Sequence, residues 1–157
     1  MNKQPTSRFC FMCGRENDVG LKMTWYNDLE NSQIWGDVVV PSHFNGYPGI
    51  VHGGIVAAIL DETSGRALMM SGQPLDELFI TAKLEVKYLL PTPVDEKLRA
   101  VGWVVKRSSR IGHVAAELRL PDGTVTASCQ ATVVRPTRKF FEKTSWDNEE
   151  QGWKVED

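Results

Sequence analysis

The sequence predicts an α+β fold in which an antiparallel sheet of about six strands packs around one long central helix. Three observations predict this fold class. The chain has 157 residues, which fits one domain rather than two. Its composition, 41% hydrophobic and 24% charged, is that of an ordinary globular protein. Short alternating apolar runs recur between turn residues, whereas only one segment has the length and period of a helix.

The expected strands follow the chain in order. Residues 19–27 and 33–40 form a hairpin. Residues 78–90 alternate between apolar and polar side chains, and Pro91 and Pro93 end this strand. Because the connections that follow are short, the remaining strands are expected to pair antiparallel. These strands lie at residues 97–107, 112–120 and 124–134.

The helix is expected at residues 54–70, with two different faces. The face predicted to pack on the sheet is apolar and holds Val56, Ile59, Leu60, Thr63, Ala67 and Met70. The opposite face carries small side chains around one carboxylate: Gly54, Ala57, Ala58, Asp61, Ser64, Gly65 and Leu68. Gly and Asp are poor helix formers, and an ordinary solvent-exposed face would collect Lys, Glu and Gln instead. This departure from local preference predicts a functional site here.

A glycine-rich segment, residues 45–54, leads into this helix. The first N–H groups of a helix have no internal partner, and the positive end of the helix dipole favours an anion or a developing oxyanion. His52 lies at this end, and Asp61 follows nine residues later. Each feature alone is more often structural. Together, donors, imidazole and carboxylate are typical of acyl-transfer or hydrolysis sites.

Residues 43–62, HFNGYPGIVHGGIVAAILDE, resemble the signature of hotdog-fold acyl-CoA thioesterases. They are most similar to the PaaI-like branch, whose motif G-x-x-H-G-G is followed by an Asp nine residues after the His. Residues 80–88 and 9–21 also resemble segments of this family. We therefore assign residues 1–135 to a hotdog thioesterase domain. Residues 136–157 are expected to form a charged tail that is partly disordered or docked.

The resemblance implies a homodimer, possibly a dimer of dimers, with active sites at the subunit interface. The N–H of Gly53 would bind the thioester carbonyl, and Asp61 would act as general base or nucleophile. His52 would orient the thioester, and Thr81 of the other subunit would position water or the Asp. Glu62, about 100° away around the helix, is the weaker candidate base.

Four further residues are expected to bind the substrate: Asn45, Gly54, Arg107 and Arg110. Some relatives have a catalytic Asn six residues before the motif His, where this chain has Gly46, and Asn45 lies one residue earlier. The corner at residues 106–110 would meet the phosphates of coenzyme A. A solvated hairpin turn is an equally good interpretation of that corner.

Composition and motifs narrow the function further. The sequence lacks the G-x-S-x-G motif of a serine nucleophile, so we predict an acyl-CoA thioesterase that uses a carboxylate. The alternatives are a hotdog enoyl-thioester hydratase and a non-catalytic acyl-thioester binding module. A net charge of −2 argues against a nucleic-acid partner. Without a membrane-spanning run or a signal-peptide pattern, a cytoplasmic location is expected.

The three cysteines are too few, and of odd number, for a secreted disulfide framework. Cys10 and Cys13 have the spacing of half a zinc site, which needs four ligands. We interpret the pair as small hydrophobic side chains, with a structural metal as the alternative, and we expect no metal or cofactor in the active site.

Overall fold

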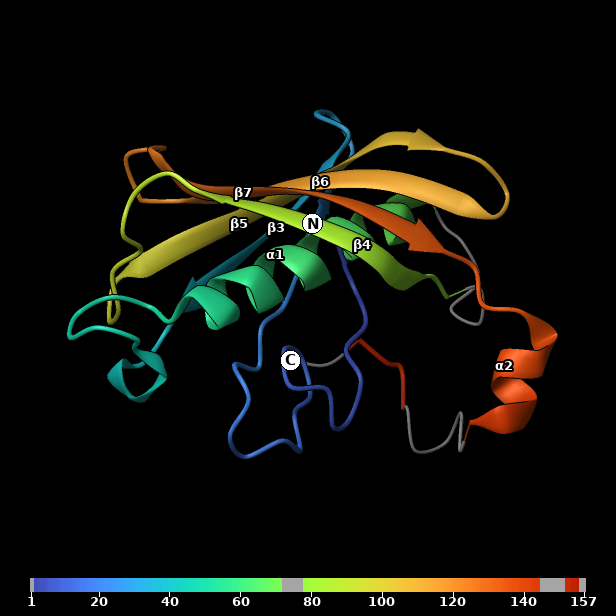
Figure 1. Ribbon diagram of the computed structural model, residues 1–157, viewed down its shortest axis with the longest axis horizontal. Coiled ribbons are helices and arrows are strands. Elements are labelled where there is room, and N and C mark those ends of the chain that lie inside the picture. Colours follow the sequence, from blue (N-terminus) through green and yellow to red (C-terminus); the bar gives the residue numbers. More distant parts are fainter. Residues whose placement is uncertain (1, 72–77, 145–151, 156–157) are drawn as a thin grey trace.

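In the computed structural model, which describes residues 2–71, 78–144 and 152–155, a curved antiparallel sheet covers one side of a long helix (Figure 1). The seven strands of this part of the chain have the spatial order β1-β2-β3-β5-β6-β7-β4. Their bounds are β1 Asn2–Lys3, β2 Tyr26–Asp28, β3 Gln33–Val39, β4 Ile80–Tyr88, β5 Lys97–Arg107, β6 Ile111–Arg119 and β7 Val125–Val134. Strand β4 is an outer edge of this sheet, where it pairs with β7.

The sequence located most strands well. The predicted bounds of β3, β5, β6 and β7 are confirmed to within one residue, and the pairing of β5 with β6 and of β6 with β7 is antiparallel as expected. The strand predicted at residues 19–27 is wrong for most of its length, because only Tyr26–Asp28 pairs with β3. Upstream, the N–H of Met23 donates to the carbonyl of Met12 at 2.8 Å, so this part pairs with the N-terminal segment instead.

Helix α1, Gly53–Arg66, packs its apolar face on the sheet as predicted. The indole N–H of buried Trp25 donates to the Thr63 hydroxyl across a distance of 3.1 Å, which fixes the helix laterally. The predicted C-terminal end is corrected: after Arg66 the chain continues as a 3-10 helix, Ala67–Ser71. Ser64 and Leu68 were assigned to the outer face, but both are buried, and Leu68 packs with side chains of β6 and β7. The tighter winding of the 3-10 turn accounts for the changed direction of Leu68.

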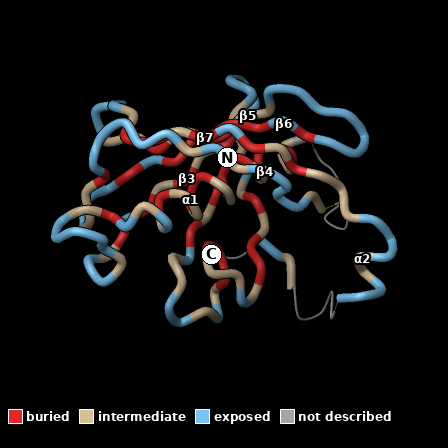
Figure 2. Tube along the Cα trace, viewed as in Figure 1, coloured by how far each residue is buried: buried red, intermediate tan, exposed pale blue. Residues whose placement is uncertain are grey.

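An N-terminal segment, residues 4–25, covers the side of α1 that faces away from the sheet (Figures 1 and 2). It has little regular structure, yet it contributes buried core side chains: Met12, Cys13, Met23 and Trp25. Lys154, near the C-terminal end of the chain, forms a backbone bridge with Thr6 of this segment. The ring of Trp153 lies 5.4 Å from the guanidinium carbon of Arg66. The helix is thus held between the sheet and this N-terminal segment.

Two short helices complete the described elements, a 3-10 turn at Ser42–Phe44 before α1 and α2 at Arg138–Lys143 in the tail. The sequence did not predict α2. Residues 145–151 of the tail, which is expected to be partly disordered or docked, lie outside the described residues. No helix within the described ranges has both the length and the apolar character needed to cross a membrane.

Helix α1 lies close to the sheet at Gly102 of β5. A Cβ there would lie 2.6 Å from the carbonyl oxygen of Thr63, which is backbone and cannot turn aside. We expect Gly102→Ala to lower the free energy of unfolding by about 1–3 kcal/mol, the usual cost of overpacking. Urea unfolding followed by tryptophan fluorescence measures it. Gly65→Ala is the control, because its added methyl meets no atom within 4 Å. An equal loss in both variants would contradict this explanation.

Candidate functional site

The start of α1 presents one backbone donor that the fold does not use. His52 is the N-cap, and its Nδ1 accepts a hydrogen bond from the N–H of Gly54 at 2.9 Å. The N–H groups of Ile55 and Val56 donate to the carbonyl of His52. Among the described residues, none accepts a hydrogen bond from the N–H of Gly53. The predicted donor is therefore available to a ligand, whereas the Gly54 N–H is occupied by His52.

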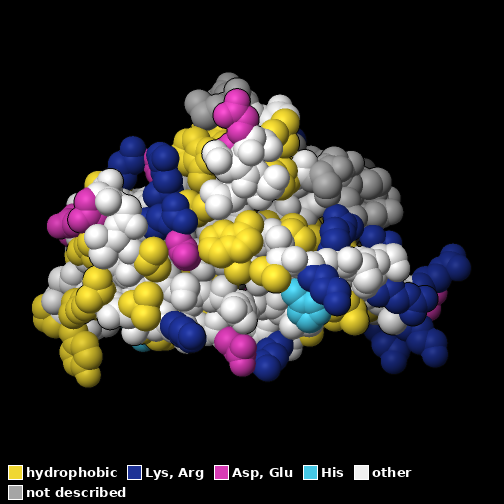
Figure 3. All heavy atoms as spheres, turned by 90° about the horizontal axis from the view of Figure 1, so that it is seen from above, with side chains coloured by type: hydrophobic (Ala, Val, Ile, Leu, Met, Phe, Trp, Pro, Cys, Tyr) yellow, Lys and Arg dark blue, Asp and Glu magenta, His cyan; other side chains and the backbone are white. Residues whose placement is uncertain are grey.

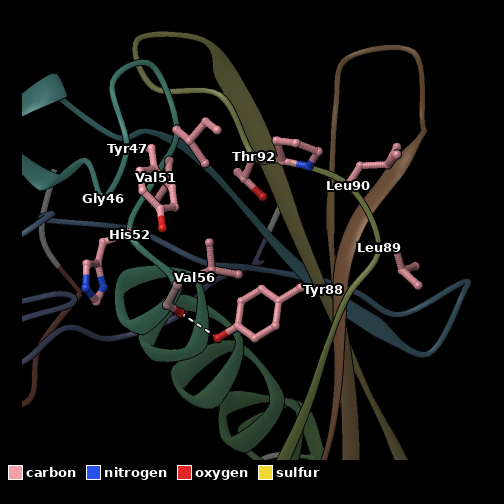
Figure 4. Close-up of a pocket in the computed structure, with 12 residues that line it drawn as sticks. Gly46, Tyr47, Val51, His52, Val56, Tyr88, Leu89, Leu90 and Thr92 are labelled. Atoms are coloured by element: carbon pink, nitrogen blue, oxygen red, sulfur yellow. Dashed lines mark hydrogen bonds between the residues drawn. The ribbon is translucent and has the colours of Figure 1, made fainter.

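This donor lies beside a pocket of about 580 Å³. The pocket is mostly apolar and is lined by Gly46, Tyr47, Ile50, Val51, His52, Gly53, Val56, Tyr88, Leu89, Leu90, Pro91 and Thr92. Figure 4 shows the rings of His52 and Tyr88 on opposite sides of the first turn of α1. An apolar pocket with a few polar groups converging on it is the usual form of a small-molecule site.

Tyr88 is a site residue that the sequence analysis missed. Its hydroxyl donates to the carbonyl of Gly53 at 2.7 Å, which ties the end of β4 to the first turn of α1 (Figure 4). The alternation of β4 assigned Tyr88 to the apolar face, yet its side chain is 56% exposed. A tyrosine at the end of an apolar alternation, just before prolines, was the available signal, since its hydroxyl needs a partner.

Asp61 and Thr81 form a second group, and the prediction that they act together agrees with the geometry. The Thr81 hydroxyl donates to Asp61 Oδ1 at 2.7 Å. This contact joins α1 and β4 of one chain, so the expectation that Thr81 comes from another subunit is wrong for this hydrogen bond. A short side chain on the edge strand next to the small-residue face of α1 is close enough to reach the carboxylate directly.

The two groups lie apart within one chain. Asp61 is eight residues after Gly53, roughly 12 Å along the helix axis, and it does not line the pocket. The two β4 residues that contact Asp61 and Gly53 are further apart than Asp61 and Gly53 themselves. Thr81 and Tyr88 are seven residues from each other, which is roughly 23 Å along an extended strand. One end of β4 therefore contacts Gly53 with its unused N–H donor, and the other end contacts the Asp61 carboxylate.

Glu62, the alternative base, faces a different part of the molecule. Its Oε1 accepts a hydrogen bond from Nε of Arg66 at 2.9 Å, and Nη1 of Arg66 donates to the carbonyl of Pro5 in the N-terminal segment. Burial raises the pKa of Glu62, and the positive charge of Arg66 opposes this rise.

The other predicted binding residues are not brought to the pocket. Asn45 is exposed and forms a backbone bridge with Val51, while its neighbour Gly46 lines the pocket. Arg107 and Arg110 flank the β5–β6 turn. Through the register of β6, β7 and β4, this turn lies at the Ile80 end of β4, the end that holds Asp61. Lys and Arg side chains gather at this end of the molecule (Figure 3).

The comparisons with known proteins agree on one family. Residues 48–127 match the family model described as "Thioesterase superfamily". The mouse (Mus musculus) protein named "Acyl-coenzyme A thioesterase THEM4" is 38% identical over 52 residues, which are 33% of this chain and 20% of that protein. The chain thus matches only a fifth of the length of this curated relative.

Solved structures extend the similarity to most of the chain. The crystal structure of protein RHA08564, a thioesterase superfamily protein, is 30% identical with a TM-score of 0.72, covering 81% of this chain and 63% of that one. A phenylacetic acid degradation-related protein from Ralstonia eutropha JMP134, described as a thioesterase, is 26% identical with a TM-score of 0.63. That match covers 73% of this chain and 85% of the other.

Proposed function

Because the chain belongs to the thioesterase superfamily and has its hotdog fold, we propose that it hydrolyses the thioester bond of an acyl- or aryl-acyl-CoA. The His52-Gly53-Gly54 turn with Asp61 supports a place in the PaaI-like branch. One observation carries the proposal: a free backbone donor faces an apolar pocket, and a carboxylate on the same helix is oriented by a hydroxyl. These are the two groups that thioester hydrolysis needs.

The active site is composed of two chains. Within one chain the Gly53 donor and the Asp61 carboxylate are held at opposite ends of β4, too far apart to act on one carbonyl group. Strand β4 is an exposed sheet edge, and such an edge pairs readily with another strand. A two-fold axis through Leu84 would set Ile80 of one protomer opposite Tyr88 of its partner. This pairing brings the Gly53 half of one protomer to the Asp61 half of the other.

The chemistry of this composite site follows from its groups. The thioester carbonyl oxygen accepts a hydrogen bond from the Gly53 N–H, which stabilises the negative charge that develops there. Asp61 of the partner, oriented by its own Thr81, removes a proton from a water molecule as that water attacks the carbonyl carbon. The tetrahedral intermediate then collapses, the C–S bond breaks and the CoA thiolate leaves. Direct attack by Asp61 would give an anhydride that water hydrolyses.

A turnover assay tests the proposed reaction. Purified protein is incubated with short-chain, medium-chain and aryl acyl-CoAs, and the released thiol is measured with a chromogenic disulfide. We expect catalytic release of CoA from at least one class. Hydration of an enoyl-CoA without thiol release would identify a hydratase instead, and binding without either reaction would identify a binding module.

Tyr88 is expected to support catalysis by holding the first turn of α1 against β4. Tyr88→Phe removes one neutral hydrogen bond, worth about 0.5–1.5 kcal/mol, and should lower kcat/KM roughly two- to tenfold. Steady-state kinetics with the best acyl-CoA measures the change. Tyr26→Phe on β2 is the matched control, since that ring stacks on Trp35 far from the pocket. Equal kinetics of Tyr88→Phe and the wild type would remove this residue from the site.

A further inference from the structure

A cluster of metal-ligating side chains lies on the other side of α1, outside the proposed active site. Cys10 and Cys13 come from the N-terminal segment, and Glu62 comes from the helix. Their two sulfur atoms and a carboxylate oxygen all lie within 4.8 Å of one another. The sequence spacing identified only the two cysteines as possible metal ligands, because the tertiary fold is what brings Glu62 next to them.

We propose that Cys10, Cys13 and Glu62 bind a zinc ion, with the fourth coordination position taken by water or a small exogenous ligand. Thiolate and carboxylate ligands about 2–2.3 Å from a tetrahedral zinc ion lie roughly 3.5–3.8 Å apart, so atoms that lie within 4.8 Å of one another need to close by no more than about 1.3 Å. Two thiolates favour zinc over calcium or magnesium, which prefer oxygen ligands. This proposal is independent of the thioesterase reaction.

Backbone hydrogen bonds fix the turn that carries the two cysteines and reach both of their sulfur atoms. The N–H of Gly14 donates to the carbonyl of Cys10 at 2.7 Å, which closes a tight turn. A Cβ at Gly14 would lie 2.6 Å from backbone atoms of Cys10, so only glycine fits. The N–H of Met12 donates to Sγ of Cys10, and the N–H of Ser7 donates to Sγ of Cys13, both at 3.4 Å. Such N–H···S bonds orient thiolate ligands and stabilise their negative charge.

The surrounding charges also fit a zinc site. Two thiolates, one carboxylate and one Zn²⁺ together carry a single negative charge. The adjacent Arg66, whose side chain is only 2% exposed, supplies the balancing positive charge through its Nε bond to Glu62. Its Nη1 donates to the carbonyl of Pro5 at 2.8 Å, which joins it to the N-terminal segment.

The metal would fasten the N-terminal segment to α1 at the residue that follows Asp61. Residues 4–25 form no helix or strand, so a metal link would supply a constraint that a sheet would otherwise provide. Cys10 is partly exposed, which leaves an access route for the ion and for a fourth ligand.

The test uses the full-length reduced protein. Metal content is measured after purification, and the metal-free protein is titrated with Co²⁺, which gives a thiolate-to-cobalt charge-transfer band in the near ultraviolet. We expect one zinc ion per chain, this band on cobalt addition, and a lower melting temperature after chelation. Cys10→Ser should abolish the band, and Glu62→Gln should weaken metal binding about tenfold or more. Cys129→Ala is the matched control, because Cys129 is buried against α1 on the sheet side and should leave metal binding unchanged.

Three results would overturn the proposal. The reduced wild-type chain could fail to bind zinc or cobalt stoichiometrically. The protein as purified could hold a Cys10–Cys13 disulfide and still bind no metal after reduction. Cys129→Ala could reduce binding as strongly as Cys10→Ser, which would indicate a general effect of cysteine loss on folding. Glu62→Gln keeps the shape of the side chain, so it tests the third ligand even where cysteine variants fold poorly.

Discussion

Asp61→Asn is expected to lower kcat by roughly 10²–10⁴-fold, the usual effect of removing a general base. The amide keeps the size of the carboxylate and can still accept the Thr81 hydrogen bond, but it cannot take a proton from water. KM should change little, because the carboxylate acts on water and lies outside the pocket. Steady-state kinetics of thiol release measures both constants.

A matched substitution separates chemistry from general charge effects. Asp122 is an exposed carboxylate in the β6–β7 turn, where it accepts a hydrogen bond from the N–H of Thr124. Asp122→Asn should keep normal kcat, because an asparagine can make the same turn contact. If folded Asp61→Asn also turned over normally, Asp61 would be removed from the mechanism and the base would have to be sought elsewhere.

Gly53→Pro is expected to lower kcat/KM by roughly 10²–10³-fold, since losing one oxyanion donor costs about 2.7–4 kcal/mol. The fold should tolerate this change. Gly53 is the first helical residue, a position that proline favours, and its N–H serves no other described residue. His52 has φ −54° and ψ 135°, a conformation allowed before proline. A near-native circular dichroism spectrum should therefore accompany the loss of activity.

Gly53→Ala is the control for the added side-chain atoms. It introduces a Cβ that would lie 3.5 Å from the Tyr88 hydroxyl, an ordinary contact, and it keeps the N–H. We expect alanine to retain far more activity than proline. Equal activity of the two variants would show that the Gly53 N–H does not bind the oxyanion, and attention would turn to other donors at the pocket.

The sequence predicted the sheet and the helix because their signals are local. The alternation in β5, β6 and β7 and the Pro121-Asp122-Gly123 turn depend only on neighbouring residues. The strand predicted over residues 19–25 is absent because the apolar residues Met23 and Trp25 fill the core beside α1 instead of alternating across a sheet.

The site was predicted as a set of residues, and its arrangement was not. The motif identified His52, Gly53 and Asp61 because their spacing along one helix start is local. The contacts of Thr81 with Asp61 and of Tyr88 with Gly53 depend on where β4 lies relative to α1, which tertiary packing decides. For the same reason, Glu62 was not linked to Cys10 and Cys13.

In the proposed dimer, each active site combines Gly53 of one protomer with Asp61 of its partner. Heterodimers of Asp61→Asn and Gly53→Pro chains test it directly. The two chains are co-expressed with different affinity tags, and the mixed dimer is purified on both. One of its two sites then carries both substitutions, while the other site carries none.

We expect this heterodimer to have about half of the wild-type activity, although each parent homodimer is nearly inactive. A heterodimer of Asp61→Asn and Thr81→Ala should stay impaired, because Asp61 and Thr81 belong to the same half of the site and neither of its sites is intact. An Asp61→Asn/Gly53→Pro heterodimer as inactive as its parents, or an active wild-type monomer in light scattering at assay concentration, would contradict the shared site.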